Sequence, residues 1–566
     1  MASHLSRAAK SALTLLAASG FDQSPVVHSG ISPVSLPSSL LNAQHETTKV
    51  TIPIVGTDPY KPTFEVTAPP YRNTEGAPCV VPLGEHTFAF SYGTPYVTTF
   101  PAVTTCDADH TVAYLTWAAS SPLGVQYDRI AAVWVNGVEL LRTSTEEPDR
   151  KSGVTWQVAK DVSQYADVLR RGGDVVIALD NVIDGPYNST FSVAVTAEFY
   201  RPRSVAHAPR KPDLVVPVSK NTTSYGWFTV QPSSSATGSN SALVTLPANT
   251  EELYLELFLS HHQCDEFYYG NPPNGYAQAN GVCGNGPFRE VQVLVDNEIV
   301  GVVWPFPLLF TGGLNPYLWR PIVAIGAFDA PTYLVNLTPF VGKFVDNKPH
   351  NVTFFVDYGI DFWPIDGNLL VYVDAKSKQT IARVLDKKLE TRVVPVTTEQ
   401  IDGVDANFTL VASRALRVTS SVTTSKGTRI YELDQSFSYS NLQQNSQKGE
   451  VGEFDAITTV TSTLTVRAPN QQQNQQGGGG GGAVHTLATV VQEDQYPIKG
   501  KTFYRPFADG TYRLEAELAN AFHRKLTVND KSPAGSSAFR ALNGCFTRAA
   551  TAVNGVVLKD VNSTAC

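Results

Sequence analysis

The sequence predicts an all-β protein with two tandem sandwich or jelly-roll domains and an additional β-rich C-terminal region. Its composition of 41 Gly, 37 Pro, 23 Tyr and 27 Phe against a single Met suits short strands and turns better than helices. Short stretches of alternating apolar and polar residues recur between turn residues. At 566 residues the chain is too long for one core, so two to four domains are expected.

Charge and hydropathy exclude two classes of partner. The formal net charge is −8 and no basic stripe is present, so a nucleic acid is not an expected partner. No apolar run reaches the roughly 18 residues of a membrane-spanning helix. We therefore expect a protein without a stable membrane span.

Cysteines and glycosylation sequons favour the secretory pathway. The six cysteines form three neighbouring pairs that suit disulfides, Cys79-Cys106, Cys264-Cys283 and Cys545-Cys566. Six sequons occur, at Asn188, Asn221, Asn336, Asn351, Asn407 and Asn562. Residues 1–50 are expected to be a disordered leader. Within it, Ser11–Gly20 follows two basic residues like a weak signal peptide. A disordered leader without a signal, or an imperfect gene start, is the alternative. The expected location is extracellular or vacuolar.

The first β-domain is expected over residues 51–200, around one hairpin. The apolar runs Ile130–Val135 and Val138–Thr143 flank Asn136-Gly137, which is the strongest short hairpin signal because both residues tolerate positive φ. Further alternating stretches are His86–Tyr92, Thr111–Trp117, Asp174–Leu179 and Ser192–Tyr200. One short helix is predicted over Val162–Arg170.

A polar, Pro/Ser-rich linker is expected over 201–240 and a second β-domain over 241–376. This domain begins with the alternating stretch Glu252–Ser260. It contains a second hairpin, in which Asp296-Asn297 joins Glu290–Val295 to Glu298–Val303. Two domains that each lead a charged pair into a hairpin indicate a duplicated architecture.

The C-terminal region, 377–566, is β-like but more polar and less regular. We expect it to pack on the first two domains. Residues 470–482 are a Gln/Gly tract and are predicted to form a flexible surface insertion, where proteolysis would divide the protein into two chains. A third hairpin is expected over Thr502–Leu518, with Asp509-Gly510 as its turn.

Adjacent charges before the hairpins are the first candidate site residues. Asp128 and Arg129 precede the first hairpin; the carboxylate would orient or deprotonate water and the guanidinium would bind an oxygen. Asp180 ends a strand of the same domain and would reach the same rim. Arg289 and Glu290 precede the second hairpin, where Glu290 would serve as a second carboxylate. The alternative for each is a structural ion pair or a turn.

A dense polar and aromatic segment, His261–Asn274, supplies the remaining candidates. Its aromatics and carboxylates suit a sugar, which presents C–H faces and hydroxyls. Zinc is rejected, because neighbouring histidines on a strand point to opposite faces and the usual ligand spacings are absent. The Pro- and Gly-containing loop Trp304–Trp319 is either a binding loop or a cap over the sheet. The binding residues proposed here are Asp265, His262, Tyr268, Trp304 and Trp319, and Glu266 is a further catalytic candidate. The alternative for His261–Asn274 is a surface loop with some buried tyrosines.

Five long runs resemble the plant and fungal peptide-N-glycanase A family. They are YDRIAAVWVNGVELLRTSTEEP, DEFYYGNPP, GNGPFREVQVLVD, VVWPFPLLFTGGLNPYLWRPI and GAFDAPTYLVNLTPFVG. The resemblance implies hydrolysis of the amide between the innermost N-acetylglucosamine and asparagine, which releases the whole glycan and leaves aspartate. No metal or organic cofactor is implied. N-glycosylated peptides and glycoproteins are the expected partners of a monomer.

A more distant similarity, to the bacterial peptide-N-glycosidase F type, implies two jelly rolls with the site at their junction. It implies Asp128 as the primary carboxylate, Arg129 as a substrate ligand and Asp180 as an accessory group. The second acid or base of that family has no direct counterpart, so Glu290, Glu266 and Asp265 all stay open. A lectin-like sandwich that binds glycans without cutting them is the alternative function, and an endoglycosidase that leaves one sugar on asparagine is a third.

Overall fold

The computed structural model describes residues 52–54, 59–65, 74–148, 151–203, 211–232, 240–314, 318–469, 484–530, 537–553 and 556–563. Nearly all regular structure in these ranges is β, as predicted. None of the helices in them is long and apolar enough to cross a membrane.

The first domain is a jelly roll of two packed sheets. One sheet has the order β1 (Tyr60–Pro62), β8 (Gly153–Asp161), β5 (Val112–Ser121), β10 (Phe191–Pro202) and β3 (Thr74–Phe88). The other has the order β4 (Tyr96–Phe100), β9 (Gly173–Leu179), β6 (Ile130–Val135) and β7 (Val138–Ser144). A 3-10 turn, η3 (Ser163–Tyr165), continues into the helix α2 (Ala166–Arg171) where the short helix was predicted.

The second domain repeats this strand order. One sheet runs β11 (Leu214–Val218), β20 (Trp363–Val373), β14 (Thr250–Leu259) and β18 (Tyr333–Asn336), with β12 (Phe228–Val230) also on β20. The other runs β13 (Ser241–Val244), β19 (His350–Asp357), β15 (Glu290–Val295) and β16 (Glu298–Val303). Its short helices are η4 (Gln263–Asp265), η5 (Tyr268–Gly270), α3 (Asn274–Asn280) and η7 (Thr338–Lys343). The eight main strands correspond one to one with β3 to β10, so the duplication is structural. The segment 201–240 differs from a plain linker, because it supplies β11 and β12.

The predicted hairpins form with the expected turns. Asn136 and Gly137 have φ of 51° and 80°, and Asp296 and Asn297 have φ of 50° and 66°, the positive values that two-residue hairpins of this kind need. Gly510, with φ of 83°, lies in the third turn.

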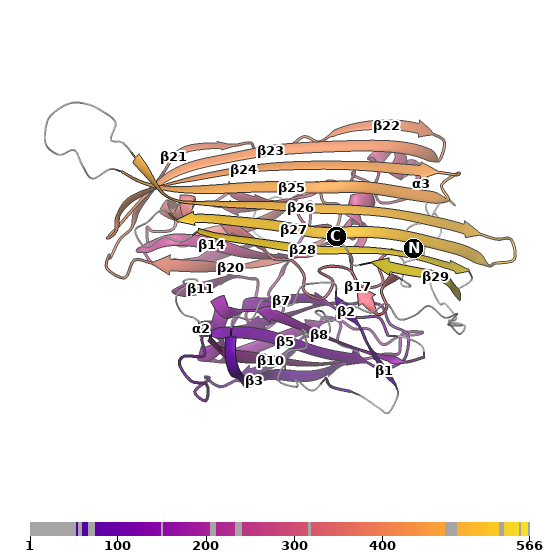
Figure 1. Cartoon of the computed structure of the whole chain (residues 1–566), viewed down its shortest axis with the longest axis horizontal. Coiled ribbons are helices and arrows are strands. Elements are labelled where there is room, and N and C mark those ends of the chain that lie inside the picture. Colours follow the sequence, from indigo (N-terminus) through magenta and orange to yellow (C-terminus); the bar gives the residue numbers. More distant parts are fainter. Residues whose placement is uncertain are drawn as a thin grey trace.

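The C-terminal region forms one nine-stranded sheet, which is more regular than its sequence indicated. Its strands are β21 (Ile381–Leu389), β22 (Val396–Asp402), β23 (Asp405–Thr424), β24 (Gly427–Ser446), β25 (Val451–Pro469), β26 (Val484–Pro506), β27 (Tyr512–Asp530), β28 (Ser537–Val553) and β29 (Val556–Ser563). Figure 1 shows the long strands side by side, on the far side of the molecule from the first domain. The contacts of this sheet run to η5 and η7, so it packs on the second domain.

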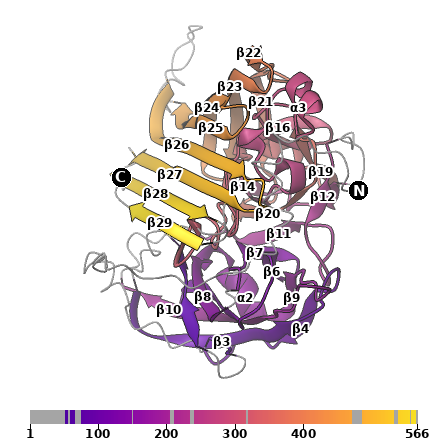
Figure 2. The ribbon, with the colours of Figure 1, turned by 90° about the vertical axis from the view of Figure 1, so that its right-hand side faces the viewer.

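The β6–β7 hairpin lies at the junction of the two jelly rolls. Val133 and Val135 face the core of the first domain, whereas Ala132 and Trp134 face the other way and are equally buried. The Trp134 indole donates to Asp366 of β20 over 2.8 Å. Figure 2 shows β7 directly against β11 and β20. At the open end of the hairpin, the N–H and the hydroxyl of Ser144 donate to the carbonyl of Ala327 over 3.0 and 2.7 Å, so this end too is fixed against the second domain.

Ionised side chains fill this junction. Arg142 of β7 donates to both carboxylate oxygens of Glu139, over 2.7 and 2.8 Å, and to Asp366 over 3.3 Å. It also donates to the hydroxyl of Ser260 at 3.0 Å. Burial raises the pKa of Asp366, and the negative charge of Glu139 adds to the effect. The Arg142 guanidinium thus offsets part of the cost of burying two neighbouring carboxyl groups.

A short N-terminal strap joins the two domains a second time. β1 pairs in parallel with β8 of the first domain, and β2 (Phe64–Glu65) pairs in parallel with β17 (Ile322–Val323), which follows β16 of the second. The buried Glu65 carboxylate accepts backbone hydrogen bonds from Gly326 and Phe328, over 2.9 and 2.6 Å. The strap therefore holds a loop of the second domain against the first.

Candidate active site

The register of the β6–β7 hairpin brings two carboxyl groups together at its open end. Ile130 pairs with Ser144. Beyond this pair, the Thr145 N–H donates to the carbonyl of Arg129, and the Arg129 N–H donates to the Thr145 hydroxyl, each over 2.9 Å. The next residues along are Asp128 on one strand and Glu147 beyond the other. The backbone N–H of Asp128 donates to the Glu147 carboxylate. Local pairing therefore makes these two groups neighbours.

The second domain adds a third carboxyl group and a glycine. Glu266 follows η4, in the segment after β14, and its charge acts on both Asp128 and Glu147. Gly312 lies in the loop after β16, whose Thr311 hydroxyl donates to the carbonyl of Thr145. A Cβ atom on Gly312 would stand 2.4 Å from Glu147 Oε1 and 3.3 Å from Asp128 Oδ1. Only a residue without a side chain fits here.

We call Asp128, Glu147 and Glu266 the carboxyl cluster. All three side chains are partly exposed, so a substrate can reach them. Burial raises the pKa of Asp128 well above its usual range, and the charges of Glu147 and Glu266 raise it further. Burial likewise raises the pKa of Glu147 to about 7 and that of Glu266 to about 7. Near neutral pH the cluster thus contains both protonated and ionised carboxyls, the pair that acid–base catalysis needs.

Arg129 and Asp180 flank the cluster on the first-domain side. Arg129 Nη2 donates to Gln126 Oε1 over 2.6 Å. Burial lowers the pKa of the guanidinium, and the nearby charges of Asp128 and Asp180 counter that effect. Asp180 accepts hydrogen bonds from the Tyr225 hydroxyl and, at 3.2 Å, from the backbone of Gly93. The structure therefore brings Asp128, Arg129, Asp180 and Glu266 into one neighbourhood, as the sequence predicted.

Glu290 does not lie in this neighbourhood, so its predicted role as a second catalytic carboxylate does not fit its position. Its carboxylate is buried and accepts from Arg414 of β23 over 2.6 Å, from Gln292 over 2.8 Å and from the Trp304 indole over 2.9 Å. This ion pair joins the second domain to the C-terminal sheet. Trp304 is buried and its indole donates to the same carboxylate, so its ring is not available to stack on a sugar.

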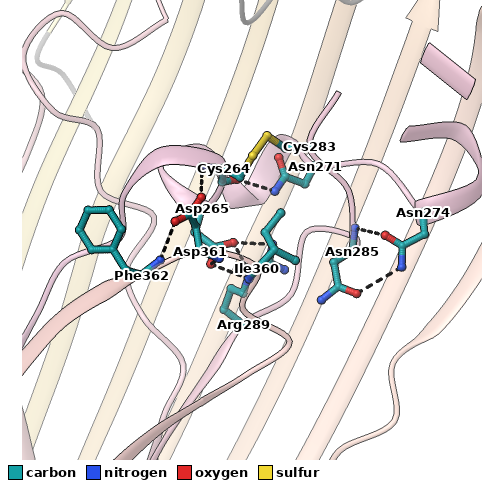
Figure 3. The surroundings of a disulfide bond; sticks show 10 residues. All are labelled: Cys264, Asp265, Asn271, Asn274, Cys283, Asn285, Arg289, Ile360, Asp361 and Phe362. Atoms are coloured by element: carbon teal, nitrogen blue, oxygen red, sulfur yellow. Dashed lines mark hydrogen bonds and ion pairs between the residues drawn. A yellow bond between two sulfur atoms is a disulfide. The ribbon is translucent and has the colours of Figure 1, made fainter. Parts of the chain in front are cut away.

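Asp265 is also fully occupied by structural contacts. Its Oδ1 accepts from Arg289 Nε at 2.8 Å, and its Oδ2 accepts from the Trp363 indole at 2.8 Å and from the backbone of Ile360 at 2.9 Å. Figure 3 shows this carboxylate beside the Cys264–Cys283 disulfide, enclosed by Arg289 and the 360–362 backbone. Asp265 therefore fixes the segment that carries Glu266 and is not free to bind substrate.

The other predicted binding residues are packing groups. Tyr268 is buried and donates to the carbonyl of Pro305 over 3.1 Å. His262 is stacked between Phe310 and Phe362, with ring centroids 5.5 and 5.4 Å away, and burial lowers its pKa to about 3, so it is neutral. The buried Trp319 indole donates to the carbonyl of Gly313 over 2.6 Å and shapes the glycine loop without facing the substrate.

Glu147 is the group that residue-level sequence reasoning missed. A signal for it was present only in part: once Asn136-Gly137 is taken as the turn, counting outward along both strands places Thr145 opposite Asp128, and the β-bulge of this hairpin moves Glu146, next to Glu147, into that position. Glu146 is the buried member of the Glu146-Glu147 pair, with Oε1 3.5 Å from the Nε of Arg320. Glu147 is left to face the cluster.

Two of the three predicted disulfides are present, Cys79–Cys106 and Cys264–Cys283. The third prediction, Cys545-Cys566, lies outside the described residues, as does the Gln/Gly tract. Within the described ranges, Asp107, Asp109 and His110 are spaced closely enough to hold a cation. Arg201 already pairs with both aspartates, at 2.7 and 3.0 Å, so we assign no metal to this group.

Comparisons with known proteins agree on one family. The family model described as peptide N-acetyl-beta-D-glucosaminyl asparaginase amidase A matches residues 67–390. A model for the PNGase_A C-terminal domain matches residues 407–476. The chain is 32% identical over 481 residues to the peptide-N4-(N-acetyl-beta-glucosaminyl)asparagine amidase A of Prunus dulcis, covering 82% of this chain and 81% of that protein.

Matches among solved structures were also found. A recombinant peptide: N-glycanase F is 17% identical, with a TM-score of 0.36 over 53% of this chain and 96% of its own. A structure of PNGF-II is 11% identical, with a TM-score of 0.37 over 53% of this chain and 66% of its own.

Proposed function

Since the chain belongs to the peptide N-acetyl-β-D-glucosaminyl asparaginase amidase A family, we propose that the carboxyl cluster is where it performs that family's reaction. The protein is a hydrolase of the amide bond between the innermost N-acetylglucosamine of an N-glycan and asparagine. It releases the whole glycan and converts asparagine to aspartate. One observation supports the assignment to the cluster: partly exposed carboxyl groups of both jelly rolls face one another there.

Amide hydrolysis requires a base for water, an acid for the leaving amine and donors for the developing oxyanion. In our proposal the reactive form of the cluster holds its protons on Glu147 and Glu266, and the ionised Asp128 accepts a proton from water as the water oxygen attacks the amide carbon. The guanidinium of Arg129 stabilises the negative charge that forms on the carbonyl oxygen. A protonated Glu266 or Glu147 then gives its proton to the nitrogen as the C–N bond breaks. The products are aspartate and the glycosylamine.

Three neighbouring carboxyls make this division of labour workable. Carboxyl groups this close together cannot all be ionised at once, because their negative charges repel, so one group stays protonated while another loses its proton. The raised pKa values near 7 for Glu147 and Glu266 make them the candidate acids. We expect turnover to decline as pH rises above about 7, because the acid is then lost.

Asp180 supports the sugar side of this site. Its position beside Arg129 suits hydrogen bonds to the hydroxyls of the chitobiose core. Because the Tyr225 hydroxyl and the backbone of Gly93 already hold it, the carboxylate is oriented before a substrate binds.

Asp128→Asn is the direct test. We expect glycan release from a glycopeptide to fall at least a hundredfold, with the thermal unfolding curve essentially retained. Mass spectrometry would follow free glycan and the Asn-to-Asp change together. Asp434→Asn is the matched control, since that carboxylate is exposed on the C-terminal sheet, paired with Arg417. A fully active Asp128→Asn protein would contradict the assignment.

The same assay separates the rival functions. Bound but unaltered glycopeptide would indicate a lectin-like protein. A peptide that keeps one sugar on asparagine would indicate an endoglycosidase.

The disulfides also support a route through the secretory pathway to an extracellular or vacuolar location. The sequon asparagines Asn188, Asn221 and Asn407 are exposed and accessible for modification. We further propose that the protein acts as a monomer and that cleavage in the Gln/Gly tract produces two chains without loss of the fold.

A further inference from the structure

Two aromatic side chains project into solvent from one short loop of the first domain. Phe90 and Tyr92 lie between β3 and β4, and each is 64% exposed. Single exposed apolar residues are ordinary, but large aromatics gathered at one place typically mark a binding surface. Their location decides whether that surface belongs to the active site.

The loop is held firmly beside Asp180. Ser91 bonds to the end of β9 twice: its N–H donates to the carbonyl of Asn181 over 3.0 Å, and its hydroxyl donates to that of Leu179 over 2.6 Å. Gly93 donates to the Asp180 carboxylate itself. With residues 91 and 93 both fixed, the positions of Phe90 and Tyr92 are set by the fold.

Tyr92 also belongs to the electrostatic surroundings of Arg129. Its hydroxyl acts on the pKa of Arg129 and on that of Tyr225, whose own hydroxyl donates to Asp180. Asp180 and Arg129 therefore connect the loop that carries the exposed aromatics to the carboxyl cluster, because Gly93 of that loop donates to Asp180 and both Asp128 and Asp180 act on Arg129. We call Phe90 and Tyr92 the aromatic rim.

The three second-domain aromatics that the sequence suggested as binding residues cannot take this role. Tyr268, Trp304 and Trp319 are all less than 4% exposed, and each donates its polar hydrogen to a protein acceptor. Phe90 and Tyr92, in contrast, offer exposed ring faces in the first domain. Ring faces next to a carboxylate and a guanidinium are the combination that carbohydrates bind, because C–H faces stack while hydroxyls pair with charges.

We propose that the aromatic rim is a subsite for a sugar of the glycan beyond the chitobiose core, stacked on Tyr92 with Phe90 as a second wall. The proposal rests on the proposed function, in which Asp128 receives the amide and Arg129 with Asp180 receives the core. It makes the glycan itself, as well as the glycosylated asparagine, a determinant of substrate choice. A rim that contacts the peptide side of the substrate is the competing outcome.

Two measurements on the full-length protein test the subsite. The first is binding of a free N-glycan larger than chitobiose, followed by ligand-observed NMR, to wild type and to Tyr92→Ala and Phe90→Ala. An aromatic contact contributes about 0.5–1.5 kcal/mol, so we expect binding to weaken about 2- to 10-fold. Tyr92→Phe keeps the ring and should restore most of the affinity. Phe507→Ala, at an aromatic 43% exposed beside the third hairpin turn, is the matched control and should bind as wild type does.

The second measurement compares two glycopeptides with the same peptide, one with a complete glycan and one with chitobiose only. We expect Tyr92→Ala to raise KM for the complete glycan several-fold with kcat unchanged, and to leave the chitobiose substrate unaffected. Equal losses on both substrates, or unchanged glycan binding, would overturn the subsite. If wild type hydrolyses neither substrate, the proposed function fails, and the binding measurement still decides on the subsite.

Discussion

Replacing Glu147 by glutamine should make the protein more stable at alkaline pH and less active. Burial raises the pKa of this carboxyl to about 7, whereas an unfolded chain holds it near about 4.3. The folded state therefore binds a proton more tightly than the unfolded state, and stability falls as pH rises from about 4.3 to about 7. Above that window the folded protein carries an unfavourable ionised group.

The size of the effect follows from the difference in pKa. At about 1.36 kcal/mol for each unit of pKa, ionisation of Glu147 costs up to about 3.7 kcal/mol at pH 8. The side chain is partly exposed, so we expect about 1–3 kcal/mol. Glutamine carries no charge and still accepts the hydrogen bond from the backbone of Asp128. At about 2–4 °C per kcal/mol for a domain of this size, Tm should rise about 5 °C at pH 8.

Thermal unfolding of wild type and Glu147→Gln at pH 4, 6 and 8 would measure this. The two proteins should have the same Tm at pH 4, where both states of wild type hold the proton, and should diverge as pH rises. Turnover of a glycopeptide should fall about 10- to 100-fold in the same variant, since an acid is lost. Glu298→Gln should change Tm in the opposite direction and lose stability relative to wild type as pH rises. Burial acts to raise the pKa of Glu298, but hydrogen bonds from Lys343 and Lys387 outweigh it and lower that pKa. A Tm difference independent of pH would refute the reasoning.

Three further results are expected. Gly312→Ala should cut activity more than tenfold with the fold retained, because φ is +94° and the new Cβ would press on Glu147 Oε1; wild-type turnover would show that the glycine loop does not shape the cluster. Arg414→Ala should lower the free energy of unfolding by about 3–5 kcal/mol, because Glu290 is left buried without its ionic partner. The pH dependence of turnover, measured on the protein that remains folded, should not change; a shifted pH dependence would connect Glu290 to the chemistry after all. Limited proteolysis within 470–482 should give two chains that elute together in gel filtration and separate only on denaturation, because β25 and β26 pair along their whole lengths; separation under native conditions would contradict this.

Local patterns in the sequence were sufficient for the hairpins and for the first-domain half of the site. Asn136-Gly137 specifies its turn through backbone sterics alone, and this turn positions Asp128 and Arg129 directly. The turn alone does not identify Glu147, because its position beside Asp128 also depends on the pairing register of the two strands. A β-bulge between Val133 and Trp134 shifts that register by one residue, so simple counting across the turn is ambiguous.

Contacts between distant segments were beyond such patterns. Glu290 next to Arg289 looked like a strand-end ion pair, yet its partner is Arg414, 124 residues later in another sheet. Asp265 and Glu266 are adjacent, and one becomes structural while the other faces the cluster, which depends on the 360–362 backbone that encloses Asp265.

The C-terminal sheet was underestimated for a compositional reason. β23 alternates between buried and exposed positions along nearly its whole length. Its buried positions include Ala412, Arg414 and Ser420 beside larger apolar residues, so the hydrophobic contrast is weak although the geometry is regular. Hydropathy alternation detects strands only where the buried face is strongly apolar.

The N-terminal strap has a practical implication for anyone expressing the enzyme. Family matching begins at residue 67, and a fragment designed from that boundary would omit Tyr60–Glu65. It would keep every carboxyl group of the cluster and both jelly rolls. It would nevertheless lack the peptide tether that clips the loop around Gly326 to the opposite domain. We would expect such a fragment to express, to look well folded by spectroscopy, and to turn over poorly.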